Sequence, residues 1–252
     1  MVALEALFRW IHIVAGIVWI GHLYFFNFVN GPFAGTMDAD TRKKVVPQLM
    51  PRALYWFRWG AAWTWITGVL LLLIAFYHTR LVFEDPFQPW TGPAIFMILV
   101  TFLAFVPYDV FWKSSFAKDV RVGVVISFSF VALIVMLYYR WAHFGYRGYV
   151  IHIGALFGTI MAANVWMRIW PLQRKIITAV KEGTPPDPTW APMAALRSRH
   201  NVYMSVPLVW AMINSHTTVP FATSPAYLLL IILIGWGGVY LLYKKAPKVP
   251  GF

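Results

Sequence analysis

Long apolar runs separated by short polar stretches dominate this chain of 252 residues. A helix needs roughly 20 residues to cross a hydrocarbon core of about 30 Å. Runs of about this length lie near residues 5–30, 57–78, 93–112, 123–141, 148–172, 192–215 and 224–243. An open sheet would leave backbone groups unpaired in lipid, and the short alternating strands of a barrel are not seen. The pattern therefore predicts an all-α, polytopic membrane helix bundle of about seven transmembrane helices, forming a single domain over residues 1–252.

The composition supports a membrane protein. Hydrophobic residues make up 60% of the chain and charged residues only 12%, so most of its length cannot be the surface of a water-soluble fold. The absence of Cys excludes disulfides, thiolate metal sites and covalently attached c-type haem. The net charge of +12 would favour nucleic acid in a soluble domain, but here the basic residues lie at the ends of apolar runs. We expect the lipid bilayer, and no nucleic acid, as a partner.

Basic residues are divided unequally between alternate connections. One set of connections holds 17 of the 21 Lys and Arg residues, and only Arg9, Arg80, Arg140 and Arg147 remain for the other. Cytoplasmic connections are the ones enriched in Lys and Arg. The N-terminus is therefore expected outside and the C-terminus in the cytoplasm, in agreement with an odd number of spans.

Four histidines lie inside predicted spans, where polar side chains are costly and usually functional. At 1.5 Å per residue, His22 lies about 15 Å deeper than His12 in the first span. His152 lies about one turn below the outer surface and His200 about two turns from the inner surface. His12 thus matches His152 in depth, and His22 matches His200.

Two histidines at one depth on neighbouring helices can supply both axial ligands of haem b. The sequence therefore predicts one or two non-covalent haem b groups, with His12 paired to His152 and His22 paired to His200. Two layers would form a transmembrane electron path. Hydrogen bonding within the bundle explains the same four histidines equally well.

Other polar residues fit this hypothesis less specifically. Arg197 and Arg199 could pair with haem propionates at the cytoplasmic interface, although lipid phosphate would serve as well. The remaining histidines, His78, His143 and His216, lie near outer helix ends, where an imidazole needs no special explanation.

Four segments carry a resemblance to a known family. They are WIHIVAGIVWIGHLYFFNFVN, VPQLMPRALYWFRWGAAWTWITG, GTIMAANVWMRIWPLQRKI and RSRHNVYMSVPLVWAMINSH. Together they resemble the N-terminal membrane domain of bacterial membrane-bound urate oxidases, also called urate hydroxylases, over nearly the whole chain. The first segment also resembles other haem-handling membrane families through its H-x6-W-x-G pattern, here His12, Trp19 and Gly21.

The resemblance implies an inner, that is cytoplasmic, bacterial membrane and an oxidoreductase setting. Its motifs carry over His12, His22, His152, His200, Asn201 and His216. In that family a C-terminal cytochrome c domain typically comes next, whereas this sequence stops at Phe252 without a Cys. We therefore expect any electrons to pass to a separate c-type cytochrome or to a quinone.

Three functions remain open from sequence. The first is a haem b redox protein, similar to cytochrome b, acting alone or as a subunit of a larger electron-transport complex. The second is an enzyme of the urate oxidase type that uses an external electron acceptor. The third is a cofactor-free structural or transport subunit, whose His and Asn residues form hydrogen bonds between helices.

Overall fold

The computed structural model describes residues 2–216 and 223–250, and every regular element in those ranges is helical. The α-helices are α1 (Val2–Tyr24), α2 (Gly31–Thr36), α3 (Ala39–Leu71), α4 (Gly92–Leu103), α5 (Phe105–Phe111), α6 (Val120–Arg140), α7 (Tyr146–Asn164), α8 (Trp170–Lys181), α9 (Trp190–Asn214) and α10 (Pro225–Lys245). The π-helical turns are η1 (Phe25–Asn30), η2 (Leu72–Tyr77) and η4 (Val165–Ile169), and the 3₁₀ turns are η3 (Ser115–Ala117) and η6 (Ala246–Lys248). The all-α prediction is confirmed for these residues.

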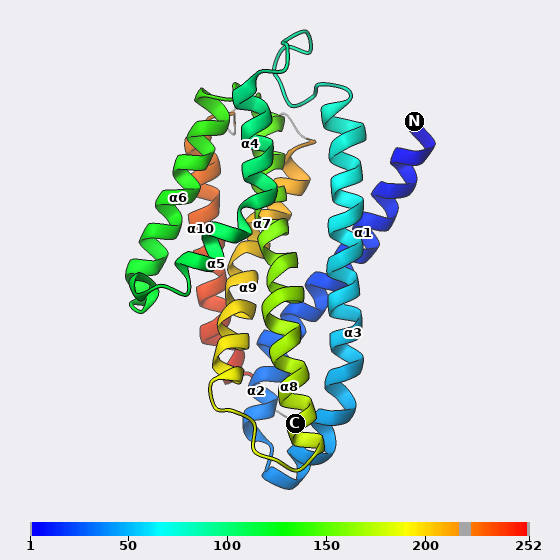
Figure 1. Cartoon of the computed structure of the whole chain (residues 1–252), viewed down its shortest axis with the longest axis vertical. Coiled ribbons are helices and arrows are strands. Elements are labelled where there is room, and N and C mark those ends of the chain that lie inside the picture. The colour runs from blue at the N-terminus through cyan, green and yellow to red at the C-terminus, as the bar shows by residue number, and fades with distance from the viewer. Residues whose placement is uncertain (1, 217–222, 251–252) are drawn as a thin grey trace. The chain divides into compact units, whose positions relative to one another are not determined.

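Several helical stretches are able to cross a membrane. In the described ranges, five are long and apolar enough: Val2–Thr36, Ala39–Tyr77, Val120–Arg140, Tyr146–Lys181 and Pro225–Lys248. Helices α4 and α5 form a sixth if the 52° bend between them, visible in Figure 1, lies within one span. Helix α9 covers the run predicted at 192–215 but falls short in hydropathy, because it carries the polar sequence Arg197 to Asn201. The chain is a multi-pass membrane protein, while the count of seven and the orientation stay predictions.

Contacts along the chain define two compact units. The first unit holds Leu70–Ile160 and Pro207–Ile234. The second unit holds Val2–Val69, Met161–Val206 and the stretch from Gly235. The expectation of a single domain stays a prediction.

The first unit depends on a close backbone contact at Gly148 in α7. A Cβ atom on this glycine would lie 2.0 Å from the carbonyl oxygen of Val82, in the connection between η2 and α4. The same carbonyl accepts a hydrogen bond of 2.9 Å from the N–H of Gly145. Beside this contact, the rings of Tyr138 and Phe144 stack with centroids 5.5 Å apart, and both are buried. The missing side chain of Gly148 therefore lets the connection lie directly on the start of α7.

The second unit has a similar close contact between α1 and α3. A Cβ atom on Gly60 would lie 3.0 Å from the backbone nitrogen of Trp19 and 3.3 Å from the carbonyl oxygen of Ala15. Small residues are typical of such contacts in membranes, where dispersion rather than the hydrophobic effect drives helix association. Leu23 and Phe57 are also buried on these two helices.

Two of the π-helical turns in the described residues, η1 and η4, end two residues before a proline. Proline has no N–H, and its ring crowds the carbonyl four residues earlier, which disturbs the α-helical ladder before it, although α3 continues through Pro47 and Pro51. Before Pro32, the N–H of Gly31 bonds to the carbonyl of Phe26, five residues back. Before Pro171, the N–H of Trp170 bonds to the carbonyl of Val165 in the same way. Each wider turn changes the phase of the helix, and hence the direction in which the side chains around it point.

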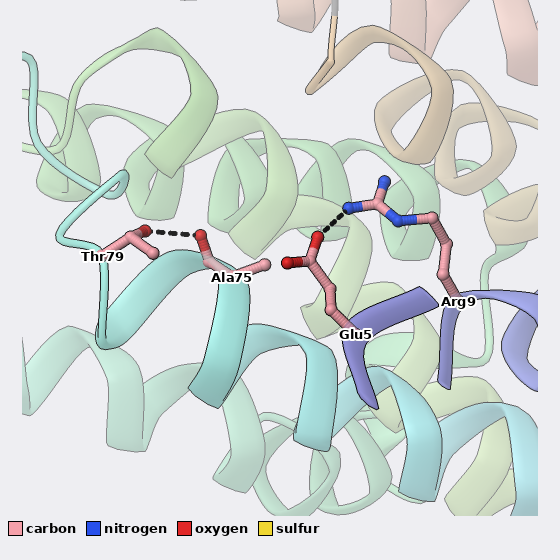
Figure 2. A network of polar contacts seen from close by, with 4 residues as sticks. All are labelled: Glu5, Arg9, Ala75 and Thr79. Atoms are coloured by element: carbon pink, nitrogen blue, oxygen red, sulfur yellow. Dashed lines mark hydrogen bonds and ion pairs between the residues drawn. The ribbon is translucent and has the colours of Figure 1, made fainter. Parts of the chain in front are cut away.

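Near two helix ends, polar side chains form an ion pair and a hydrogen bond to a backbone carbonyl (Figure 2). In the first turns of α1, Glu5 and Arg9 form an ion pair one turn apart. A carboxylate here also interacts favourably with the helix dipole, although a partly exposed pair stabilises little. After η2, the Thr79 hydroxyl donates to the carbonyl of Ala75 at 2.6 Å, which satisfies a carbonyl that the ending helix leaves open.

We expect Gly148→Ala to destabilise the protein strongly, because its Cβ would overlap a backbone oxygen that no side-chain rotation can move. The cost should be about 3 kcal/mol or more, at the upper end of overpacking effects. The matched control is Gly237→Ala in α10, where a Cβ would meet nothing within 4 Å. Thermal unfolding in detergent should give a lower Tm for Gly148→Ala and an unchanged or higher Tm for Gly237→Ala. Equal Tm values for both variants would contradict the close contact.

Candidate functional site

His12 is held between α1 and α3 in the second unit. Its Nδ1 lies 2.9 Å from the carbonyl oxygen of Thr64 and 3.2 Å from Oγ1 of Thr67. A carbonyl can only accept, so Nδ1 carries the proton and Nε2 keeps its lone pair. A Cβ atom on Gly68 would lie 3.0 Å from the ring carbon Cε1, so the imidazole rests directly on the α3 backbone. This tautomer, with a backbone acceptor on Nδ1, suits a histidine that binds a metal through Nε2.

His22, about three turns further along α1, has the same tautomer. Its Nδ1 donates to the carbonyl of Val18 at 2.7 Å, which leaves the Nε2 lone pair unused by that bond. The ring of Phe26 lies one turn further on, with its centroid 6.4 Å away.

His200 lies on α9, which is hydrogen-bonded to the end of α1 and to η1. The Tyr24 and Ser205 hydroxyls are 2.9 Å apart, and Asn27 Nδ2 donates to Ser198 Oγ at 2.8 Å. These bonds set the register of the two antiparallel segments. Tyr24 opposite Ser205 would offset His22 from His200 by about 10 Å along the helices, and Asn27 opposite Ser198 by about 5 Å. The predicted layer of His22 and His200 stays a prediction.

The two arginines proposed for haem propionates have different surroundings. Arg197 is buried, whereas Arg199 is exposed and its guanidinium carbon lies 5.2 Å from the Tyr243 ring centroid. Residues two apart on a helix do not face each other. Arg197 and Arg199 therefore do not present two parallel guanidinium groups to the propionates of one haem.

His152 lies in the first unit, fully buried on α7. Its Nδ1 donates to the carbonyl of Gly148 at 2.7 Å, and its Nε2 lies 3.0 Å from the Tyr77 hydroxyl of η2. With the proton on Nδ1, the Tyr77 hydroxyl must be the donor, so the Nε2 lone pair is used within the protein. The ring centroids of Phe144 and Tyr138 lie 4.6 and 5.6 Å from that of the imidazole. In this arrangement His152 is a packed hydrogen-bonding residue and does not fit an axial haem ligand.

The predicted layer of His12 and His152 joins residues of different units, and it stays a prediction. His78, His143 and His216 are exposed. Between residues 2 and 216 and from 223 to 250, no group of three or more His, Cys, Asp or Glu side chains could hold a metal ion.

A family model described as urate oxidase N-terminal matches residues 32–245, most of the chain. The chain belongs to this family. No curated protein and no solved structure matches it. The resemblance predicted from the sequence is thus confirmed, and the matched range includes His152 and His200 but not His12 and His22 on α1.

Within the range matched by the urate oxidase N-terminal family, a buried amide pair joins α7 and α9 in the second unit. Asn164 Nδ2 donates to Asn201 Oδ1 at 2.9 Å, and Asn201 Nδ2 donates to the carbonyl of Met161 at 2.9 Å. Neither residue is exposed. Unsatisfied amides are expensive in an apolar interior, so this chain of bonds fixes the facing of the two helices.

Sequence reasoning did not identify Tyr77, Thr64 or Thr67 as partners of the histidines. Each is an ordinary residue for an apolar helix, and no local signal marks it. Tyr77 ends a π-helical turn, and such a turn shifts side-chain directions in a way that regular helical periodicity does not predict.

We expect Tyr77→Phe to destabilise the protein by about 1–3 kcal/mol, because it leaves a buried His152 nitrogen without a donor. His152→Leu should cost a similar amount by stranding the Tyr77 hydroxyl. The double variant should cost clearly less than the two single variants together, since both polar groups are then gone. Thermal unfolding in detergent measures all three, and additive costs would argue against the bond.

The control for this cycle is Tyr139→Phe. Tyr139 is exposed, its ring packs edge-on against Tyr149, and its hydroxyl takes part in no hydrogen bond within the described residues. Its replacement should leave the stability unchanged.

Proposed function

We propose that this chain is a membrane-embedded redox protein of the urate oxidase family that passes electrons between haem b and a separate c-type cytochrome or quinone. It would lie in the bacterial inner membrane with seven spans, its N-terminus outside and its C-terminus in the cytoplasm. Other subunits of an electron-transport complex are its expected partners.

The family match supports the urate oxidase relationship. The observation that carries the haem proposal is the pair of α1 imidazoles. His12 and His22 both donate from Nδ1 to a carbonyl and leave Nε2 able to bind iron. Haem b would supply a one-electron carrier within the membrane. The second axial ligand of each haem is left open by this proposal, because Nε2 of His152 already bonds to the Tyr77 hydroxyl.

The residues around His12 have defined tasks in this proposal. The Thr64 carbonyl holds the proton on Nδ1 and makes the imidazole a better donor toward a metal at Nε2. Gly68 gives the ring room against the α3 backbone, and a side chain there would displace it.

A second candidate function is purine oxidation at the membrane itself with an external electron acceptor. It rests on the family match over residues 32–245. A structural subunit without a cofactor remains the third candidate.

We expect the purified protein to show a haem b spectrum on dithionite reduction, with one or two haems per chain in a pyridine haemochrome assay. His12→Ala and His22→Ala should each lower the haem content, by about one haem where the replaced residue is a ligand. His78→Ala is the matched control, because His78 is exposed. His152→Leu should also keep its haem. A colourless wild-type protein, or full haem in both α1 variants, would contradict the haem proposal.

The second candidate has its own assay. Purified protein is mixed with urate and either cytochrome c or a quinone analogue, and both urate loss and acceptor reduction are followed against a control without protein. Urate loss that persists in His12→Ala and His22→Ala would favour an enzyme whose chemistry does not need the α1 histidines. Failure with several acceptors would count against urate oxidation.

A further inference from the structure

An arginine in the second unit lies within a membrane-spanning stretch without a protein acceptor for its guanidinium group. Arg58 lies near the start of the apolar run of α3, and its Nε atom is buried. Throughout the described residues, no hydrogen bond or ion pair engages this guanidinium. Buried N–H groups that lack a partner are costly, and charged ones more so. The two terminal nitrogens, Nη1 and Nη2, are not among the buried atoms, so an acceptor from outside the chain can reach them even though it cannot reach Nε.

Aromatic rings hold the Arg58 guanidinium in one place. Its central carbon lies 4.0 Å from the ring centroid of Trp170, 5.9 Å from that of Trp166 and 5.7 Å from that of Tyr55. The shortest of these is a stacking distance, and cation–π attraction stabilises such an arrangement. Stacking occupies the face of the planar group and leaves the N–H donors at its edge, where they can form a fork for two oxygens.

Further contacts hold this aromatic clamp of Tyr55, Trp166 and Trp170 in place. The indole N–H of Trp166 donates to the carbonyl of Arg58 itself at 3.0 Å, and the ring of Trp59 meets Trp166 edge-on at 5.4 Å. Trp166 and Trp170 are one turn apart, the first within the η4 turn and the second directly before Pro171. The phase change at η4 thus accompanies an arrangement in which both indoles contact Arg58.

Within the described residues, no carboxylate pairs with this group. Among the acidic residues of the second unit, Glu5 pairs with Arg9, Asp38 bonds to Thr41, and Asp187 bonds to Thr189. An external anion that presents two oxygens would match the free edge of the guanidinium.

The surroundings of Arg58 indicate which anion. The neighbouring side chains Tyr55, Trp56, Trp59 and Trp63 on α3 are 40–58% exposed. Exposed Trp and Tyr at the end of an apolar run are typical of the membrane interface, at the depth of the lipid headgroups. The anion most abundant at that depth is the phosphate of a phospholipid.

We propose that Arg58, clamped by Trp166, Trp170 and Tyr55, is a binding site for the phosphate group of a phospholipid. The stacked guanidinium donates its edge N–H groups to the phosphate oxygens, and the lipid chains lie along the aromatic surface of α3. This site is independent of haem and of urate chemistry.

The experiment is native mass spectrometry of the detergent-purified full chain, titrated with phosphatidylglycerol. Diacylglycerol with the same acyl chains lacks the phosphate and tests the apolar contribution. Inorganic phosphate, added as a competitor, tests whether a soluble anion occupies the site instead. We expect one tightly held phosphatidylglycerol per chain above a background of weak binding, no comparable binding of diacylglycerol, and no displacement by millimolar phosphate.

Two variants distinguish the contribution of the positive charge from that of the planar guanidinium group. Arg58→Gln should weaken the tight site by about tenfold or more, because the charged fork is lost. Arg58→Lys keeps the charge but not the planar fork, and should weaken it several-fold. The matched control is Arg52→Gln on the same helix, whose exposed guanidinium already bonds to the carbonyl of Gln48 and which should bind lipid as the wild type does.

Each result bears on the proposal. If Arg58→Gln does not fold, the Arg58→Lys titration decides, and wild-type affinity in that variant would overturn the site. Equal loss in Arg52→Gln would indicate a diffuse charge effect and would also overturn it. Displacement by inorganic phosphate would make the ligand a soluble anion and overturn the assignment to a lipid.

Discussion

The structure depends on a single constraint, which is that the bilayer interior offers no hydrogen-bond partner to a polar side chain. Within the spans, the chain meets this constraint mostly by local bonds from a side chain to the carbonyl four residues earlier. This holds for His22 to Val18, His152 to Gly148, Asn27 to Leu23, Thr64 to Gly60 and Thr101 to Met97. Such a bond satisfies one end of the side chain within its own helix and leaves the other end to act across helices.

That second end is what connects one helix to the next. The Nε2 atom of His152 accepts a hydrogen bond from the Tyr77 hydroxyl. The side-chain amide of Asn27 donates to the Ser198 hydroxyl, and its side-chain oxygen accepts from the Tyr243 hydroxyl. Thr101 shares a bond of 2.6 Å with the hydroxyl of Tyr138. The polar residues of the spans therefore act in pairs that fix which helix faces meet, while glycines such as Gly60 and Gly148 set how closely the backbones approach.

The lengths of the apolar helices can be predicted from the sequence, whereas the direction in which each side chain points around its helix cannot. The helices at Val120–Arg140 and Pro225–Lys245 match the runs predicted at 123–141 and 224–243 within a few residues. Depth arithmetic could place His22 and His200 in one layer, but it could not identify Ser205 and Ser198 of α9 as the partners of Tyr24 and Asn27. The π turns before Pro32 and Pro171 widen the helix by a local exchange of hydrogen bonds, and regular 3.6-residue periodicity does not include that change. Partners such as Tyr77 for His152, and the indole clamp of Arg58, were hidden for the same reason.

The two functional hypotheses draw on different parts of the chain. The family match begins at residue 32, so it covers the Asn164–Asn201 pair and His152 but leaves α1 outside. The electron-carrier proposal draws its strongest support from α1, where two imidazoles keep an available Nε2, whereas the purine-oxidation alternative draws on the matched range. The α1 segment that holds His12 and His22 resembles the same family in sequence, so both parts of the chain belong to one protein type. Because only the electron-carrier proposal requires the α1 imidazoles, His12 and His22 are the residues whose replacement separates the two functions most sharply.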